Sequence, residues 1–326
     1  MAITLREEMQ QMAMAAHLYY EGGCTQQEVA VAMGISRPTI SRLLVRAREE
    51  HIVTITVVDP FAINQELVDE FCRETGLKEA VITSAISSAP DLNLKRVGIS
   101  AARYLEKNIK PQDVVGVGWG RTLYAIVQSL QPQSVTDVTL VPLTGGLGQI
   151  SPHFQVNELI RIFAKNFKGT SYQLFLPAIV ENEEAKSNLM ASEDSKMITS
   201  IWDHLTTALV GIGNVDFETE LSVLFVNYLD VETRQRLLSA DATGDICMQF
   251  FDRNGYAITD GLRGVIGISL EQLRRVPNVI AIASGSSKAQ AILSAIKGKY
   301  IQTLITDDLT ARTILSILKE EKNNDK

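Results

Sequence analysis

The sequence predicts an α/β fold in which a small helical domain, residues 1–58, precedes a larger domain with a mostly parallel sheet, residues 59–326. Two observations support this prediction. Near the N-terminus, two short helical patterns meet at a glycine. After about residue 65, runs of valine, isoleucine and leucine alternate with amphipathic helical segments. Continuous apolar runs suit parallel strands that are buried on both faces of a sheet.

The N-terminal segment begins with a helical pattern from Leu5 to Tyr20, which stops at a pair of glycines. Thr25 and Glu28 then form a capping-box pattern, which indicates the start of a second short helix. Ala30 is small enough for another helix to cross close to it.

A third helix is expected to follow a tight turn at Gly34. Ser36 can cap this helix, with Pro38 in its first turn. Ile40, Leu43 and Leu44 recur on one side, which is therefore expected to be buried. This arrangement indicates a helix-turn-helix.

The outer face of the third helix is basic on a protein whose net charge is −7. Residues 36–48 hold four of the five arginines in the first 55 residues and no acidic residue. In a helix-turn-helix, such a helix enters the DNA major groove, where arginines pair with guanine edges or phosphates. A helical hairpin with a solvated charged face is the alternative. The expected contacts to double-stranded DNA are Thr25, Gln26, Ser36, Arg37, Thr39, Ser41, Arg42 and Arg46.

Seven apolar runs predict the strands of the larger domain. They are AVIT (80–83), VVGVG (114–118), VTLVPL (138–143), YQLFLP (172–177), ALVGIG (208–213), VIAIASG (279–285) and TLITD (303–307).

Glycines and hydroxyl side chains follow three of these runs, in VGVGWGRTL (115–123), LTGGLG (143–148) and ASGSSKAQAI (283–292). Ligands bind at the carboxyl ends of parallel strands, so backbone N–H groups of these loops are expected to face an anion. Lys288 opposes the dipole of its helix unless an anion lies opposite. Each loop could instead be an ordinary strand-to-helix turn.

Two carboxylates beside glycines, Asp245 and Asp260, can accept hydrogen bonds from the hydroxyls of a polyol. Either could instead form a turn. The glycines at 116, 118 and 120 do not match a dinucleotide fingerprint, whose third glycine lies later in the loop. Thr122 is expected to donate to a sugar, and Trp119 to form a lid or a subunit contact.

Composition argues against several classes of protein. The three cysteines, Cys24, Cys72 and Cys247, form no CxxC pair, so a disulfide framework, a metal site and an extracellular location are not expected. The N-terminus lacks a signal-peptide pattern and no apolar stretch is long enough to span a membrane, so a cytoplasmic protein is expected. The four histidines are scattered and no hydrolase or nucleotide-binding motif occurs, so neither catalysis nor a cofactor is expected. A sugar-phosphate isomerase with an accessory head is the alternative.

The order of these motifs resembles the SorC family of sugar-responsive bacterial transcriptional regulators, most distinctively over residues 279–315. The resemblance implies a DNA-binding head and a Rossmann-like effector domain similar to ribose-5-phosphate isomerase, glucosamine-6-phosphate deaminase and CoA transferases. It also implies a homotetramer that binds operator DNA and a sugar or sugar phosphate. A relative that forms a Schiff base has a lysine where this chain has Thr144, so reversible, non-covalent binding is expected.

Carried over by position, the resemblance implies effector contacts in the same strand-end loops. They are Gly116, Gly118, Trp119, Gly120, Thr122, Thr144, Gly145, Gly146, Asp245, Asp260, Gly285, Ser286, Ser287 and Lys288.

Overall fold

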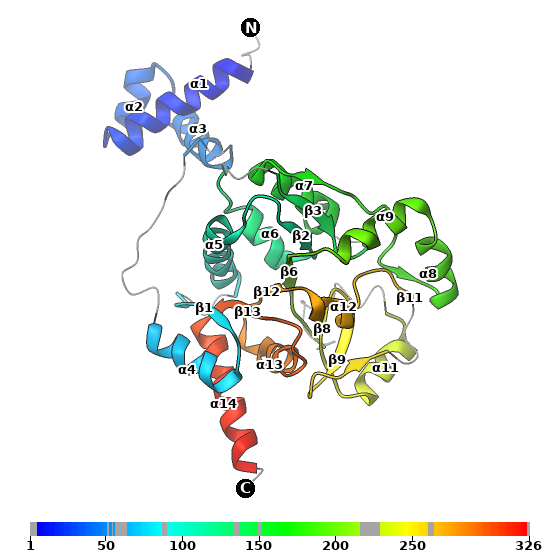
Figure 1. Cartoon of the computed structure of the whole chain (residues 1–326). Helices are drawn as coiled ribbons and strands as arrows, with labels where there is room; N and C mark the ends of the chain where they lie inside the picture. Colours follow the sequence, from blue (N-terminus) through cyan, green and yellow to red (C-terminus); the bar gives the residue numbers. More distant parts are fainter. Residues whose placement is uncertain are drawn as a thin grey trace. The chain divides into compact units, whose positions relative to one another are not determined.

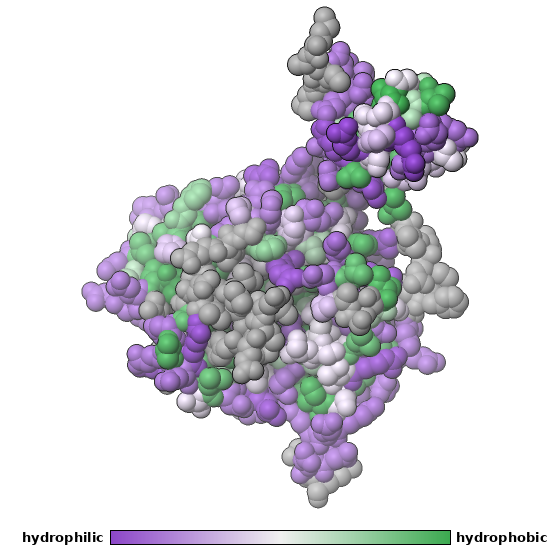
Figure 2. All heavy atoms as spheres, turned by 180° about the vertical axis from the view of Figure 1, so that it is seen from behind, coloured by the Kyte–Doolittle hydropathy of each residue, from purple (hydrophilic) through white to green (hydrophobic). Residues whose placement is uncertain are grey.

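The chain divides into two compact units, Met1–Pro60 and Phe61–Lys326 (Figure 1). The computed structural model describes residues 5–50, 52–53, 55, 64–86, 90–132, 137–148, 152–215, 229–259 and 264–324. Hydrophilic side chains dominate the face drawn in Figure 2, and apolar side chains form scattered patches among them.

The N-terminal unit contains the expected helices. They are α1 (Leu5–Ala16), the π-helical turn η1 (His17–Glu21), α2 (Gln26–Met33) and α3 (Arg37–Glu49). The helical pattern predicted from Leu5 to Tyr20 is therefore present, but its last turn is widened into the π form. The three helices share one small core, formed by Met12, Ala15, Val29, Ala30, Ile40, Leu43, Leu44 and Ala47. The predicted buried side of α3 is confirmed.

The second unit is built on a parallel sheet of seven strands. In spatial order these are β1 (Glu79–Thr83), β13 (Thr303–Asp307), β12 (Asn278–Ile282), β6 (Thr207–Gly211), β2 (Val114–Val117), β3 (Thr139–Pro142) and β4 (Thr170–Ser171). The strand order reverses between β2 and β6. From β2 the chain proceeds to β3 and β4 on one side, whereas from β6 it proceeds to β12 and β13 on the other.

Helices cover both faces of this sheet, as Figure 1 shows. One face packs against α5 (Pro90–Asn108), α6 (Arg121–Val127) and α7 (Val156–Phe167). The other packs against α4 (Gln65–Thr75), α9 (Glu193–Trp202), α12 (Leu270–Arg275), α13 (Ala289–Lys297) and α14 (Asp308–Asn324). Side chains alternate between the two cores along each strand: Leu209 lies in the first, and Ala208 and Val210 in the second. This burial on both faces explains the continuous apolar runs.

Two smaller sheets flank the main one. The first is antiparallel and contains β10 (Ala257–Ile258), β9 (Gln249–Asp252), β8 (Ala242–Ile246) and β7 (Gly213–Asn214). The second pairs β11 (Gly264–Val265) with β5 (Ile179–Val180), near α8 (Glu183–Met190). Helix α11 (Val231–Ser239) packs against β9 through Leu237 and Phe250.

The strand predicted at residues 172–177 is wrong. The ladder to β3 extends only through β4 and one further bond, from the Tyr172 N–H to the Leu140 carbonyl at 2.9 Å. Beyond that point the Asn157 amide, on α7, bonds both the N–H and the carbonyl of Leu174, at 3.2 and 3.1 Å. A side chain thus takes the place of the next strand partner.

Helices α5 and α6 make their closest backbone approach at Gly98. A Cβ atom at Gly98 would lie 2.7 Å from the Ala125 carbonyl oxygen and 2.8 Å from the Ala125 Cβ. We therefore expect Gly98→Ala to lower the free energy of unfolding by about 1–3 kcal/mol, as overpacking does. Helix propensity alone predicts that alanine would instead raise the free energy of unfolding by about 1 kcal/mol.

Urea unfolding of the full chain measures this difference. Gly148→Ala is the matched control, because no atom lies within 4 Å of its added Cβ. A Gly98→Ala variant that is as stable as the parent protein would show that the two helices do not approach so closely.

Candidate functional site

The start of α2 is held by the predicted capping box. The Thr25 N–H donates to the Glu28 carboxylate at 2.7 Å, and the Glu28 N–H donates to the Thr25 hydroxyl at 3.3 Å. The Thr25 N–H and the Thr25 hydroxyl, which also donates to the Glu28 carboxylate at 2.9 Å, hold the pKa of Glu28 below its usual value. At the other end of α2, Gly34 adopts the left-handed conformation, with φ of 66°, that the turn requires.

The start of α3 is capped by Ser36, whose hydroxyl accepts from the Thr39 N–H at 3.3 Å and bonds the Thr39 hydroxyl at 2.8 Å. Arg37 and Arg42 are exposed, and Ser41 is half-buried. Arg46 forms an ion pair with Glu8 of α1, which raises the pKa of Arg46 through a hydrogen bond and through charge attraction. Arg37 and Arg42 are therefore freer than Arg46 to contact an outside partner.

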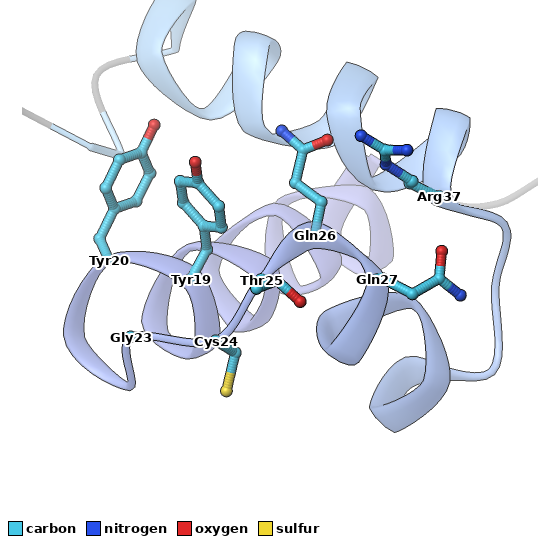
Figure 3. Close-up of a pocket in the computed structure, with 8 residues that line it drawn as sticks. All are labelled: Tyr19, Tyr20, Gly23, Cys24, Thr25, Gln26, Gln27 and Arg37. Carbon is cyan, nitrogen blue, oxygen red and sulfur yellow. The ribbon is translucent and has the colours of Figure 1, made fainter.

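A surface hollow lies between the end of η1 and the starts of α2 and α3 (Figure 3). Figure 3 shows the Tyr19, Tyr20, Gln26 and Arg37 side chains directed to one side, whereas Cys24 points away from them. Phenol, amide and guanidinium groups all donate hydrogen bonds to phosphate oxygens. The sequence interpretation missed Tyr19, Tyr20 and Gln27, because only the folded arrangement of η1, α2 and α3 brings them to this hollow.

In the α/β unit, the loops after β2, β6 and β12 meet where the strand order reverses. The Gly118 N–H donates to the Leu209 carbonyl at 2.8 Å, which holds the loop after β2 against β6. A Cβ at Gly118 would lie 3.3 Å from that oxygen and 3.4 Å from the Cys247 Sγ. Such a reversal leaves a crevice at the carboxyl ends of the strands, which is where ligands bind in sheets of this type.

Asp245 and Lys288 both lie near the carboxyl end of β6. Asp245 is buried on β8 and accepts from the Met248 N–H at 3.0 Å. The Lys288 Nζ, at the start of α13, donates to the Ile212 carbonyl at 2.9 Å. Ile212 connects β6 to β7, and β7 pairs with β8 at Asp245. The four-stranded antiparallel sheet thus brings the Asp245 carboxylate to the end of the seven-stranded parallel sheet.

Burial perturbs both of these charged groups. It raises the pKa of Asp245 to about 6, although the Met248 N–H and the positive charge of Lys288 oppose the change. It lowers the pKa of Lys288, and the negative charge of Asp245 opposes that change. Perturbed groups of opposite charge at a strand-end crevice are characteristic of ligand-binding sites.

Most of the predicted anion-binding N–H groups already have partners within the protein. The Gly120 N–H donates to the Phe154 carbonyl at 3.3 Å, and that of Gly285 to the Asp307 carboxylate and the Thr310 hydroxyl, at 3.2 and 2.8 Å. Sequence reasoning missed Asp307 and Thr310, although an aspartate between a strand and a helix was visible in TLITDD. These two residues fix the turn that precedes Ser286, Ser287 and Lys288.

The loop after β3 requires a correction. The Gly145 and Gly146 N–H groups donate to the Ile266 and Leu176 carbonyls at 2.9 and 2.8 Å. Thr144 is fully buried, and its hydroxyl donates to the Ile266 carbonyl at 3.2 Å. These three residues therefore join segments of the fold, and the N–H groups of the two glycines bond within the protein instead of facing an open anion site as expected.

Gly116 also requires a correction. It lies inside β2, where a Cβ would come within 2.4 Å of the Leu143 side chain. Because Gly116 has no side chain, the Leu143 side chain can pack directly against β2 at this position. Thr122 is buried in the first turn of α6, and Trp119 packs with Met248 in a small apolar cluster. Asp260 lies outside the described residues.

Among the residues that the structure describes, no group of three or more histidine, cysteine, aspartate or glutamate side chains could hold a metal ion. No helix in the described ranges is long and apolar enough to cross a membrane.

Comparisons with known proteins cover nearly the whole chain. Residues 58–316 match the family model described as "Putative sugar-binding domain", and residues 14–50 match "Sigma-70, region 4". The deoxyribonucleoside regulator of Bacillus subtilis is 35% identical over 319 residues, which are 96% of this chain and 99% of that protein. The sorbitol operon regulator of Klebsiella pneumoniae is 33% identical over 312 residues, 95% of this chain and 98% of that protein.

The crystal structure of the full-length sorbitol operon regulator SorC from Klebsiella pneumoniae covers 94% of this chain and 98% of its own, with a TM-score of 0.75 and 34% identity. These matches confirm the predicted helix-turn-helix followed by an α/β domain with a parallel sheet. The relatives are named as regulators, in agreement with the prediction of a regulator in place of an enzyme. The chain therefore belongs to the SorC-type family of sugar-binding, DNA-binding transcriptional regulators.

Proposed function

We propose that this regulator binds a sugar or sugar phosphate in the crevice between β2 and β6, and that this binding controls a carbohydrate-utilisation operon. The observation that carries the proposal is the convergence of Asp245 and Lys288 at the reversal of strand order. A carboxylate accepts hydrogen bonds from sugar hydroxyls, and an ammonium group pairs with an anionic substituent. The names of relatives that refer to sorbitol and deoxyribonucleosides support a polyol or sugar effector.

The proposed effector contacts are a subset of the residues expected from the sequence. Gly118, Trp119, Gly120 and Thr122 would form one wall, and Asp245 with the turn from Gly285 to Lys288 the other. Asp260 is also proposed as an effector contact, on the basis of the sequence alone. Thr144 is buried and carries a hydroxyl in place of an amine, which supports reversible, non-covalent binding.

The DNA contacts proposed are those of α3 and of the start of α2. Arg37 and Arg42 would reach base edges or phosphates from the N-terminal half of α3, and Gln26 and Thr25 would contact the backbone. Ser36, Thr39, Ser41 and Arg46 would support this surface. A regulator that binds operator DNA acts in the cytoplasm.

We also propose that the protein forms a homotetramer. Exposed apolar side chains on α5 and α14, among them Leu92, Ile99 and Leu309, support association between copies of the α/β unit. An effector would then change operator affinity by favouring one arrangement of the subunits, since two sites are linked only through states that the ligand binds unequally.

The DNA-binding face can be tested with Arg37→Ala and Arg42→Ala. Each change should weaken binding by about 1–3 kcal/mol if the side chain reads a base, and should reduce the salt dependence if it contacts a phosphate. The DNA is the duplex that the full-length protein selects from a random library, and fluorescence anisotropy gives the Kd. Arg275→Ala, which removes an exposed arginine of α12, should leave the Kd unchanged. Operator binding that survives both changes in α3 would contradict the assignment.

The role of Asp245 can be tested by a thermal-shift screen of free and phosphorylated sugars. A ligand that binds the folded protein raises its melting temperature. We expect at least one sugar to raise the Tm of the parent protein, and Asp245→Asn to abolish most of that rise. An unchanged shift in the Asp245→Asn protein would place the sugar elsewhere.

The raised pKa of Asp245 predicts a specific pH dependence of stability. Because the folded state binds this proton more tightly than the unfolded chain, the stabilising contribution is complete below pH 3.8 and is lost as the pH rises through about 6. The full contribution is about 3 kcal/mol, and the difference in unfolding free energy, parent minus Asp245→Asn, should fall by about 2 kcal/mol from pH 4.5 to pH 7.5. Urea unfolding from pH 4.5 to 7.5 measures it. The exposed Asp241, changed to Asn, is the control and should reproduce the parent profile.

A further inference from the structure

A second cation, Arg121, lies at the same end of the sheet as Lys288. Arg121 is the first residue of α6 and follows the loop that begins at Gly118. Trp119, two residues before Arg121 in that loop, is close to β6: a Cβ at Gly211 would lie 3.9 Å from the Trp119 carbonyl oxygen. The residue after Gly211 is Ile212, whose carbonyl accepts from the Lys288 Nζ at 2.9 Å. Arg121 and Lys288 therefore follow two strands, β2 and β12, that both lie next to β6.

Electrostatics supports this proximity. Burial is the main reason that the pKa of Lys288 is lowered; the negative charge of Asp245 opposes this change, and the positive charge of Arg121 adds to it. Like charges that are brought together cost free energy unless anions balance them. A site with two neighbouring cations is therefore suited to an anion with more than one negative charge.

Each cation has a carboxylate partner, but the two partners differ in exposure. Asp245, beside Lys288, is buried. Arg121 forms an ion pair with Asp91 in the first turn of α5, and the two side chains are 36% and 75% exposed. An exposed ion pair contributes little stability, so another anion can replace Asp91 at little cost. Asp245 is fixed in its strand, whereas Asp91 is exchangeable.

We propose that Arg121 binds the anionic group of the effector in exchange for Asp91, and that this group is a phosphate monoester. The proposal rests on the proposed function, because it assigns the charged end of the same crevice. A planar guanidinium group offers paired N–H donors that match two phosphate oxygens. Lys288 adds a point charge, and Asp245 remains available for hydroxyl groups. Asp91 acts as an internal competitor that weakens the affinity for the effector.

Phosphate titration of the full-length protein tests the exchange. The probe is inorganic phosphate at pH 7.5 and constant ionic strength, followed by isothermal titration calorimetry. Arg121→Gln should weaken the Kd by about tenfold to a hundredfold, as expected for the loss of charge-assisted hydrogen bonds. Arg121→Lys, which keeps the charge and loses the paired donors, should lie between this variant and the parent. Asp91→Asn should tighten the Kd by about two- to fivefold.

Two further variants separate this proposal from the proposed function. Glu271→Gln breaks an ion pair with Arg275 in which the side chains are 74% and 70% exposed, and it should leave the Kd unchanged. Lys288→Met should weaken phosphate binding because it removes the other cation.

Lys288→Met could weaken phosphate binding while the Arg121 and Asp91 variants bind phosphate as the parent protein does. That result would overturn the exchange but would agree with effector binding in the crevice. The same conclusion follows if phosphate does not bind to the parent protein but a neutral sugar raises its Tm. If phosphate binds equally to every variant, it binds outside the crevice, and the exchange is overturned. The thermal-shift loss expected for Asp245→Asn then decides separately whether the crevice binds a sugar.

Discussion

The reversal of strand order between β2 and β6 is the constraint on which the rest of the α/β unit depends. The chain proceeds from these neighbouring strands to opposite sides of the sheet, and in sheets of this type ligands bind at the carboxyl ends of such strands. The bond from the Gly118 N–H to the Leu209 carbonyl joins the two exits, and the missing side chain at Gly118 allows that contact. The crevice is therefore a consequence of topology. The charged side chains at its edge are what make it specific.

The two sides of the crevice differ in how their charges are held. Asp245 is buried on a strand, and its carboxylate is ionised at neutral pH only against the cost of desolvation. A folded protein retains such a group where function requires it, because an apolar residue would be more stable there. Lys288 is held to a backbone carbonyl and follows a turn that Asp307 and Thr310 fix. These contacts order the site before any ligand arrives, which lowers the entropy cost of binding.

The sequence predicted the elements far better than the contacts between them. Helix-turn-helix signals are local, so Thr25, Gly34 and Ser36 could be assigned to caps and a turn that the structure bears out. The strand predicted at residues 172–177 is wrong because Asn157, on the preceding helix α7, bonds the backbone of Leu174 in place of a strand partner. No local sequence pattern indicates this bond. The expectation that the Gly145 and Gly146 N–H groups face an anion was wrong for a similar reason, because their partners, the Ile266 and Leu176 carbonyls, are remote in sequence. Arg121 was overlooked because its partner, Asp91, lies on another helix.

Ligand control requires an interaction that differs between the empty and the occupied protein. Under the proposed function, Asp245 and Lys288 would keep their places when the effector binds and would supply affinity. The Arg121–Asp91 pair, under the proposed exchange, exists only in the empty state. Occupation would then release the first turn of α5 from the first turn of α6, although the two helices stay packed together at Gly98. Under the proposed exchange, the start of α5 is the element whose partner would change on binding, and in the proposed homotetramer a signal to other subunits would begin there.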